Sequence, residues 1–367
     1  MKSGTTSIQS FLFGQRAALV EQGVLPLGRR WNEQAHGVQA LIDRPEAPDD
    51  RWLRLVEQAR AWDGTSVISM EYLGPFLPHR VEAAVASFGD LPVDVVVTLR
   101  DLNRTIPSLW QEVVQNGRSW SWPDYRAGAR DARPWHPDPP RVVSEPGRTF
   151  WRQQHACRIV DRWSSVVGVD RVTVVTLPAP GAPRSTLLDR FGRAVGFDPS
   201  GLAAPASQNT SLGAASAQLL QRVNARLSDL GLGDSDARAV RKALLAKQVL
   251  SARRDQEQPI GLEVEPWVVG TAGELVTRLG ATGVRLEGDW HDLAPVAARG
   301  VDPSATSEED LVAAARFGFD GLREVLADRP VGADLPRWGD PDDADGAVRA
   351  LADLVRASVR QADRTRP

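Results

Sequence analysis

Cysteine is nearly absent from the sequence, because Cys157 is the single thiol among 367 residues. One thiol excludes an internal disulfide framework and a thiolate metal cluster, and it fits a reducing compartment. Long apolar runs are missing as well, and none approaches the roughly 18–20 residues that span a bilayer. The sequence also lacks the pattern of a secretory leader. These absences predict a soluble cytoplasmic protein that does not insert stably into a membrane.

An excess of charge of either sign is absent too. The 44 basic and 47 acidic residues leave a net charge of −3, which argues against a nucleic-acid partner. His79, His136, His155 and His291 have no ligand-like spacing, and we expect no metal site. Lysine is scarce among the bases and is found only at Lys2, Lys242 and Lys247. Because almost every other basic residue is Arg, the presence of a lysine indicates a task that needs a mobile point charge.

The first turn of the chain carries an anion-binding pattern, made by Lys2, Ser3, Gly4, Thr5, Thr6 and Ser7. Apolar residues then recur at helical spacing, so this turn opens a helix. The free N–H groups of a first turn and the helix dipole both favour phosphate. Gly4 lets the backbone come close to the anion, and Lys2 supplies a mobile charge. The sequence therefore predicts a phosphate site here.

Strands alternate with helices over the first half of the chain. Apolar runs predict strands at 65–70, 93–99 and 171–177, and the β-branched run at 93–99 is typical of a strand buried on both faces. Helical patterns lie between and beside them, among them 34–41, 51–62, 150–167 and 187–195. This order predicts an α/β fold with a parallel sheet flanked by helices and ligands at the carboxyl ends of the strands. From Leu212 onward the patterns are mostly helical, so we expect a core at 1–205 and a helical accessory region at 206–367.

A second anion-binding element follows the strand at 93–99. Arg100 stands at the carboxyl end of this strand, and Ser108 lies two helical turns further on. Both side chains can reach a phosphate beside the first loop, and the planar fork of Arg suits two parallel hydrogen bonds to phosphate oxygens. The pair predicts a second phosphate site next to the first.

With these two elements the chain resembles the sulfotransferases, bacterial members included, that use 3′-phosphoadenosine-5′-phosphosulfate (PAPS). Their Lys-Ser-Gly-Thr-Thr loop is matched by Lys2–Thr6, and their Arg and Ser eight positions apart are matched by Arg100 and Ser108. The resemblance covers residues 1–210. It implies a P-loop NTPase-like core, PAPS as the sulfuryl donor, and in-line transfer without an obligatory metal. The acceptor would be a hydroxyl or amine of a carbohydrate, lipid or small metabolite.

The resemblance also implies roles for individual residues. Lys2 would stabilise the bridging oxygen that leaves with the nucleotide, because charge develops there only in the transition state. Thr5 and Thr6 would donate to the 5′-phosphate. Arg100 and Ser108 would bind the 3′-phosphate, so their loss should mainly weaken donor binding.

The acceptor proton needs a base, and the sequence offers three candidates. Glu71 follows the strand at 65–70, at the position that matches the catalytic His of cytosolic family members; the alternative is a helix cap or an ion pair. Other branches of the family use a Glu from the segment after the first helix, where this chain has Glu33 and His36. His36 has the side chain that titrates near neutral pH, and its alternative is a surface or packed histidine.

A loop rich in aromatic residues is predicted at 118–149. Trp120, Trp122, Tyr125 and Trp135 lie in it among Pro and Arg. They either form a lid over the acceptor or pin the loop to the core.

Two later segments are weaker candidates for nucleotide contacts. The segment 283–290 resembles the Gly-rich closing motif of cytosolic sulfotransferases but lacks its leading Arg-Lys pair, so we expect a structural strand and turn. Asn209 and Ser211 are candidates for the nucleotide or for the edge of the core.

Two other functions compete with sulfuryl transfer. Lys2-Ser3 also matches the end of the P-loop motif of kinases and ATPases, and Asp101 would then be the magnesium ligand at a strand end. The third possibility is an inactive nucleotide-binding remnant, because the family leads into its phosphate loop through an apolar strand and Met1 directly precedes Lys2 here. Because the rest of the core pattern is intact, we expect that the true start codon lies upstream. Without that strand its neighbours expose their edges, and we expect the chain as given to be poorly soluble or inactive.

Overall fold

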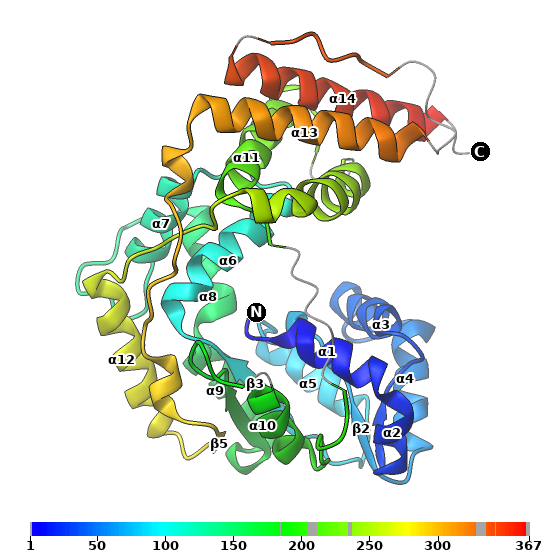
Figure 1. The fold of residues 1–367 in the computed structure, drawn as a ribbon. Helices are drawn as coiled ribbons and strands as arrows, with labels where there is room; N and C mark the ends of the chain where they lie inside the picture. The colour runs from blue at the N-terminus through cyan, green and yellow to red at the C-terminus, as the bar shows by residue number, and fades with distance from the viewer. Residues whose placement is uncertain are drawn as a thin grey trace.

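The structure of the protein is a computed structural model that describes residues 2–183, 185–203, 211–233, 237–327, 335–341 and 343–364. It has a mixed α/β fold with two small parallel sheets and many helices (Figure 1). One sheet pairs β1 (Val24–Pro26) with β2 (Thr65–Val67). The other consists of β3 (Val95–Leu99), β4 (Val172–Thr176) and β5 (Arg285–Glu287), in that order. The predicted class of parallel strands flanked by helices is confirmed.

Helices cover both faces of the sheets, because the strands are apolar on both sides. On one face Val95, Val97 and Val174 pack with α3 (Trp31–Asp43), α4 (Asp50–Arg60), α5 (Pro78–Ala86), α9 (Ala156–Val167) and α12 (Pro266–Gly280). On the other face Val96 and Val175 pack with α1 (Thr5–Gly14), α2 (Arg16–Glu21) and α10 (Ser185–Val195). Side chains that alternate along each strand produce these two apolar layers. The sheets are thus the middle of three layers.

Strands β3 and β4 differ in burial although both are β-branched runs. Every residue of β4 is buried, whereas every residue of β3 is half-buried. Both faces of β3 are covered, as the pattern at 93–99 predicts, but its residues are only half-buried. The reason is that β3 pairs with β4 along one edge, while its other edge lines a cavity of about 580 Å³.

Helix α6 (Leu102–Gln115) leads from β3 into a helical body (Figure 1). Its apolar side chains belong to one buried cluster that also contains α7 (Trp122–Asp131), α8 (Glu145–Gln154), α11 (Ala214–Asp229), a π-helix η3 (Ala239–Val249), α13 (Glu308–Ala327) and α14 (Ala344–Arg364). The helical region predicted after Leu212 is thus present, but its core also takes in α6–α8. The predicted boundary at 205/206 falls at residues 204–210, outside the described residues. In the part of the chain that the structure describes, no helix is both long and apolar enough to cross a membrane.

The helix predicted over 150–167 is two helices, α8 and α9. His155 separates them because it caps α9: its Nδ1 accepts a hydrogen bond from the backbone N–H of Arg158 at 3.3 Å. The spacing of apolar residues continues through the break, so periodicity alone did not reveal it.

The predicted loop at 118–149 contains a helix, α7, which begins after the cap residue Ser121. Trp122 and Tyr125 lie on α7 and are fully buried in the helical cluster. These two aromatics pin the segment to the core, and the lid alternative is wrong for them. Trp135, at 39% exposure, is the aromatic of this segment that remains at the surface.

The strand expected within 283–290 is confirmed as β5, which extends the second sheet through Val174 and Leu286. Short 3-10 helices account for several remaining connections: η1 (Glu71–Leu73), η2 (Val169–Arg171), η4 (Leu250–Gln256), η5 (Trp290–Leu293) and η6 (Pro303–Ala305).

Candidate functional site

The first turn of the chain folds around Gly4. Its φ of 83° lies in the left-handed region that favours glycine. A Cβ at this position would lie 2.6 Å from Cδ2 of Leu187, so a side chain here would also require Leu187 to shift. The carbonyl of Gly4 accepts hydrogen bonds from the N–H groups of Ser7 and Ile8, at 3.0 and 3.1 Å. Helix α1 therefore begins directly after Gly4, and the backbone N–H groups at its start point out of the end of the helix.

Ser3 fixes this turn to the second sheet. It is 4% exposed, and its Oγ lies 2.7 Å from Oγ1 of Thr98 on β3. Thr5 is half-buried, and Thr6 and Ser7 are exposed. Among the described residues no side chain caps α1, so the amides of its first turn are available to an anion. Ser3 anchors the loop, while its neighbours face outward.

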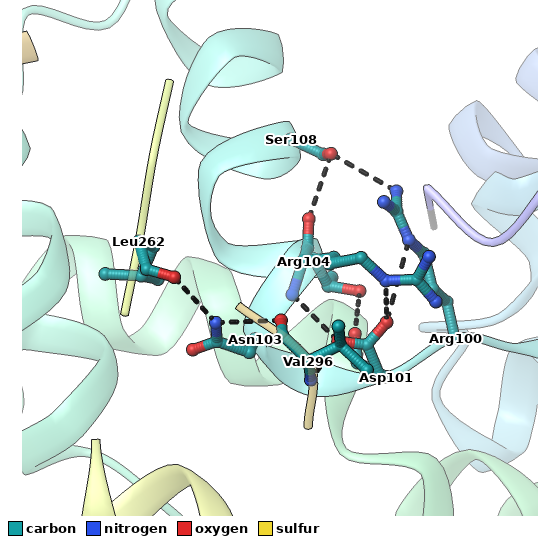
Figure 2. A network of polar contacts seen from close by, with 8 residues as sticks. Arg100, Asp101, Asn103, Arg104, Ser108, Leu262 and Val296 are labelled. Carbon is teal, nitrogen blue, oxygen red and sulfur yellow. Dashed lines mark hydrogen bonds and ion pairs between the residues drawn. The ribbon is translucent and has the colours of Figure 1, made fainter. Parts of the chain in front are cut away.

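Arg100 lies two residues beyond Thr98, at the carboxyl end of β3. Its Nη1 donates to Oγ of Ser108 at 3.3 Å, and Ser108 Oγ donates to the carbonyl of Arg104 at 3.1 Å (Figure 2). The two residues of the predicted second site thus meet across two turns of α6. Because Ser3 contacts Thr98 on the same strand, Arg100 and Ser108 lie at the same end of β3 as the Gly4 turn.

Asp101 holds the start of α6 beneath this pair. Its carboxylate is fully buried, caps the helix by accepting from the N–H of Arg104 at 3.0 Å, and pairs with the Arg104 side chain (Figure 2). The backbone N–H of Val296 also contacts it, at 3.5 Å. This carboxylate is a structural cap, which does not favour the alternative of a magnesium ligand.

The cations at this strand end are only partly neutralised. Burial, followed by the charge of Arg104, lowers the pKa of Arg100 from its ordinary value. Nη2 of Arg104 is buried and has no hydrogen-bond partner among the described residues. A buried donor without a partner is costly.

All three lysines of the sequence lie within the electrostatic influence of one carboxylate, that of Glu112 on α6, and two of them form ion pairs with it. Lys2 Nζ is 3.3 Å from Oε2 of Glu112, and Lys242 Nζ is 3.1 Å from Oε1. Burial raises the pKa of Glu112, but Lys2 and Lys242 outweigh it and bring this pKa down to about 2. Burial and the charge of Lys242 lower the pKa of Lys247. The lysine cluster, Lys2, Lys242 and Lys247, therefore lies in one electrostatic field.

Two members of the lysine cluster come from the helical body and were not predicted as site residues. Lys242 and Lys247 are five positions apart on η3, and five residues make about one turn of a π-helix. They consequently lie on the same side of η3. The scarcity of lysine was the signal in the sequence that links these two positions to Lys2.

The candidate base Glu71 lies on η1, next to this cluster. Gln9 of α1 donates to Oε2 of Glu71 at 3.1 Å and to the carbonyl of Ser69 at 2.9 Å. Burial and the charges of Glu112 and Glu71 raise the pKa of Tyr72, which places Tyr72 in the field of both carboxylates. Helix α1 thus begins at the predicted phosphate loop, and one turn further along the helix its Gln9 side chain orients Glu71.

The other candidate bases lie on the outside of α3. His36 and Glu33 are exposed, and no contact of the described residues joins them to the Lys2–Ser7 loop. Gln34, between them, is fully buried instead. Its side chain donates to the carbonyls of Leu27 and Val67 and accepts from the N–H of Ser69, at 2.9–3.0 Å.

The remaining candidates add little to the site. Ser211 is half-buried, next to Leu212, whose N–H donates to Oε1 of Gln111 on α6 at 3.1 Å. Asn209 lies outside the described residues. Within the described ranges, no group of three His, Cys, Asp or Glu side chains is arranged to hold a metal ion.

Comparison with known proteins finds no matching family model, no similar curated protein and no similar solved structure. The geometry of the site therefore carries the functional argument. It places two predicted anion-binding elements side by side, with Lys2 paired to Glu112 and a carboxylate, Glu71, oriented by Gln9.

Proposed function

We propose that the protein is a sulfotransferase that moves a sulfuryl group from PAPS to an acceptor hydroxyl of a carbohydrate, lipid or small metabolite. One observation carries the proposal: the Gly4 turn and the Arg100–Ser108 pair lie at the same end of β3. Ser3 contacts Thr98 at 2.7 Å, and Arg100 follows two residues later. A donor with a phosphosulfate at one end and a 3′-phosphate at the other needs two neighbouring anion sites.

The residues present fit this donor. The left-handed turn at Gly4 and the first-turn amides of Thr5 and Thr6 suit the 5′-phosphate. Arg100, Ser108 and the unpartnered Nη2 of Arg104 suit the 3′-phosphate. The proposal assigns no role to a metal ion.

Lys2 and Glu71 carry the chemical step in this proposal. Lys2 exchanges Glu112 for the bridging oxygen of the donor, where negative charge grows as the S–O bond to the nucleotide breaks. Glu71 accepts the proton of the acceptor hydroxyl as the new S–O bond forms, and Gln9 holds the opposite carboxylate oxygen in place. The proton ends on Glu71, and the leaving electron pair stays on the nucleotide.

Calorimetric titration with adenosine 3′,5′-bisphosphate, the desulfated product, tests the donor site. We expect binding without magnesium, and Arg100→Ala should weaken it about 10- to 100-fold, because one charge-assisted hydrogen bond contributes about 1.5–3 kcal/mol. Arg323→Ala, an exposed change on α13, should leave the affinity unchanged. Indifference to the bisphosphate would refute the proposal. Magnesium-dependent ATP hydrolysis would instead favour the kinase or ATPase alternative.

A further inference from the structure

Three cations lie along one side of the π-helix η3. Arg238 directly precedes this helix, and Lys242 and Lys247 follow it at intervals of four and five residues. The backbone hydrogen bonds of a π-helix join residues five apart, so such intervals bring side chains to the same side. An α-helix turns by about 100° per residue, which would put Lys247 about half a turn away from Arg238. The π winding therefore gathers these three cations, which we call the cationic face of η3.

The apolar side of η3 sets the direction of the cationic face. Val240, Leu244 and Leu245 are buried in the helical cluster that also contains α6, α11 and α13. Arg238 and Lys247 are exposed, as expected for side chains on the opposite side of the helix. Apolar packing therefore anchors η3 to the helical body and leaves its cations pointing out of that body.

Lys242, in the middle of the cationic face, connects it to the predicted donor loop. Its Nζ is 3.1 Å from Oε1 of Glu112, and Nζ of Lys2 is 3.3 Å from Oε2 of the same carboxylate. Lys2 precedes the Gly4 turn at the start of α1. The cationic face consequently lies beside the start of α1, although η3 belongs to the helical body.

The two ends of the cationic face act electrostatically on η1, which carries the candidate base. Desolvation by the surrounding protein, followed by the charge of Lys242, lowers the pKa of Lys247, and the charge of Glu71 acts in the opposite direction. Desolvation raises the pKa of Tyr72, next to Glu71, and the charge of Arg238 acts in the opposite direction. The candidate base therefore lies opposite the cationic face.

Positive charge exceeds negative charge in this region. Lys2 and Lys242 share the carboxylate of Glu112. Arg238 and Lys247 form no ion pair or hydrogen bond with the residues that the structure describes. When Lys2 turns to the donor, as the proposed function requires, Lys242 still neutralises Glu112. Arg238 and Lys247 then remain uncompensated, and like charges close together favour a bound anion.

We propose that the cationic face of η3 binds an anionic group of the acceptor, a carboxylate, phosphate or sulfate, and so restricts sulfuryl transfer to hydroxyl compounds that carry such a group. This inference rests on the proposed function, in which Glu71 receives the acceptor proton. The anionic ends of the donor are already assigned to the Gly4 turn and to the end of β3, so an anion at η3 belongs to the other substrate. Arg238 and Lys247 bind it, while Lys242 stays with Glu112.

Paired ligands that differ in one anionic group test this assignment. Glucuronate with glucose and glycerol phosphate with glycerol are titrated into the full chain saturated with adenosine 3′,5′-bisphosphate. A third pair consists of vesicles with phosphatidylglycerol and vesicles with a neutral glycosyl diacylglycerol. We expect the anionic member of at least one pair to bind at least tenfold more tightly than its neutral partner. The pair that responds says whether a soluble compound or a lipid headgroup carries the group.

Variants of the cationic face then locate the binding. Lys247→Gln and Arg238→Gln should each weaken binding of the anionic member about tenfold, because each removes a charge-assisted contact. Binding of the neutral member and of the bisphosphate should not change. Lys247→Arg should retain the preference. Arg323→Gln, an exposed change on α13, is the control for the general effect of one lost positive charge. With PAPS present, Lys247→Gln should raise KM for the anionic acceptor and leave kcat nearly unchanged.

The outcomes separate this inference from the proposed function. No preference for the anionic member in any pair would overturn the inference, as would equal losses in Lys247→Gln and Arg323→Gln. Neither outcome touches the proposed function while the bisphosphate still binds. If the bisphosphate does not bind, although anionic ligands bind through Lys247, the proposed function fails. The assignment of the anion to an acceptor fails with it, and only the anion site stands.

Discussion

Gly4 combines a left-handed backbone with a close contact, and the two constraints can be separated by mutation. Gly4→Ala meets both the positive φ, which costs about 1–2 kcal/mol, and the 2.6 Å approach to Leu187. Gly23→Ala is the matched control, since Gly23 has a φ of 81° and no atom within 4 Å of the position that an alanine methyl would take. In urea unfolding, we expect Gly4→Ala to lose at least about 1 kcal/mol more stability than the control. Equal losses would show that Leu187 moves aside freely.

Glu112 should contribute a pH-dependent stability that belongs to the lysine cluster. Its pKa is about 2 in the folded protein, against an ordinary value of 4.5. A depressed carboxyl pKa stabilises the fold above the ordinary value, and this contribution is lost as the pH falls from about 4.5 to 2. We expect Glu112→Gln to cost on the order of 3 kcal/mol at pH 7, with the difference from wild type shrinking through that window.

Urea unfolding at pH 7, 4 and 3 measures this effect. Glu274→Gln is the control, because Glu274 forms an exposed pair with Arg278 at 2.6 Å and exposed pairs contribute little. A Glu112→Gln difference that does not change with pH would contradict the charge argument.

The sequence was most informative about the site at the level of single residues. Spacing alone identified Arg100 and Ser108, which meet at 3.3 Å. It did not identify Glu112, Lys242 or Gln9, because these contacts join segments far apart in the chain. The roles of all these residues in catalysis stay predictions.

At the scale of elements, the break between α8 and α9 has its own pH signature. Burial, and then the charge of Arg158, lower the pKa of His155 from 6.5 to about 4. The unfolded chain therefore binds more protons than the folded one between these values, and stability is lost as the pH falls from 6.5 to 4. We expect a loss on the order of 3 kcal/mol over this range, relative to His155→Asn.

Asn is chosen because it retains the capping of α9. Thermal unfolding of both proteins from pH 7 to pH 4 measures the difference. His79→Asn changes an exposed histidine on α5 and should follow the wild type. If His155→Asn also follows the wild type, the histidine is not the source of the pH dependence.

Helices and strands were predicted well where a periodic pattern met a local stop signal. Helix α10 agrees with its pattern because Gly196 ends it. Strand β4 agrees with its pattern because both of its faces are covered. The pattern failed at α7, where Trp and Pro suggested a loop although Pro123 stands in the first turn of a helix. Burial of an aromatic depends on what packs against it: Trp110 of α6 packs against Trp122, and Phe150 of α8 packs against Tyr125.

At the scale of the whole molecule, α6 belongs to two units. It begins at β3 and carries Ser108, yet Trp110 and Val114 are buried in the helical cluster. The sequence placed α6 within a core at 1–205, and the nonlocal packing of the helical cluster was not visible in it. We expect α6 to open together with the helical body rather than with β4.

Native-state hydrogen exchange on Phe319→Ala tests this coupling. Phe319 is fully buried on α13, and its truncation should cost about 3–5 kcal/mol. The amides of α6 should lose the same protection as those of α13, while those of Val172–Thr176 keep theirs. Protection of α6 that stays with β4 would contradict a shared helical unit.

The presence of every lysine within the electrostatic influence of Glu112 also has a practical chemical consequence. The side-chain primary amines of this sequence are those of Lys2, Lys242 and Lys247, so an amine-directed reagent modifies side chains only at the candidate site. Acylation followed by mass spectrometry would then report occupancy of the site, with Lys2, at 36% side-chain exposure, a more accessible target than Lys242 at 15%. Coupling the protein to a sensor surface through lysine would, for the same reason, attach it by the proposed binding surface.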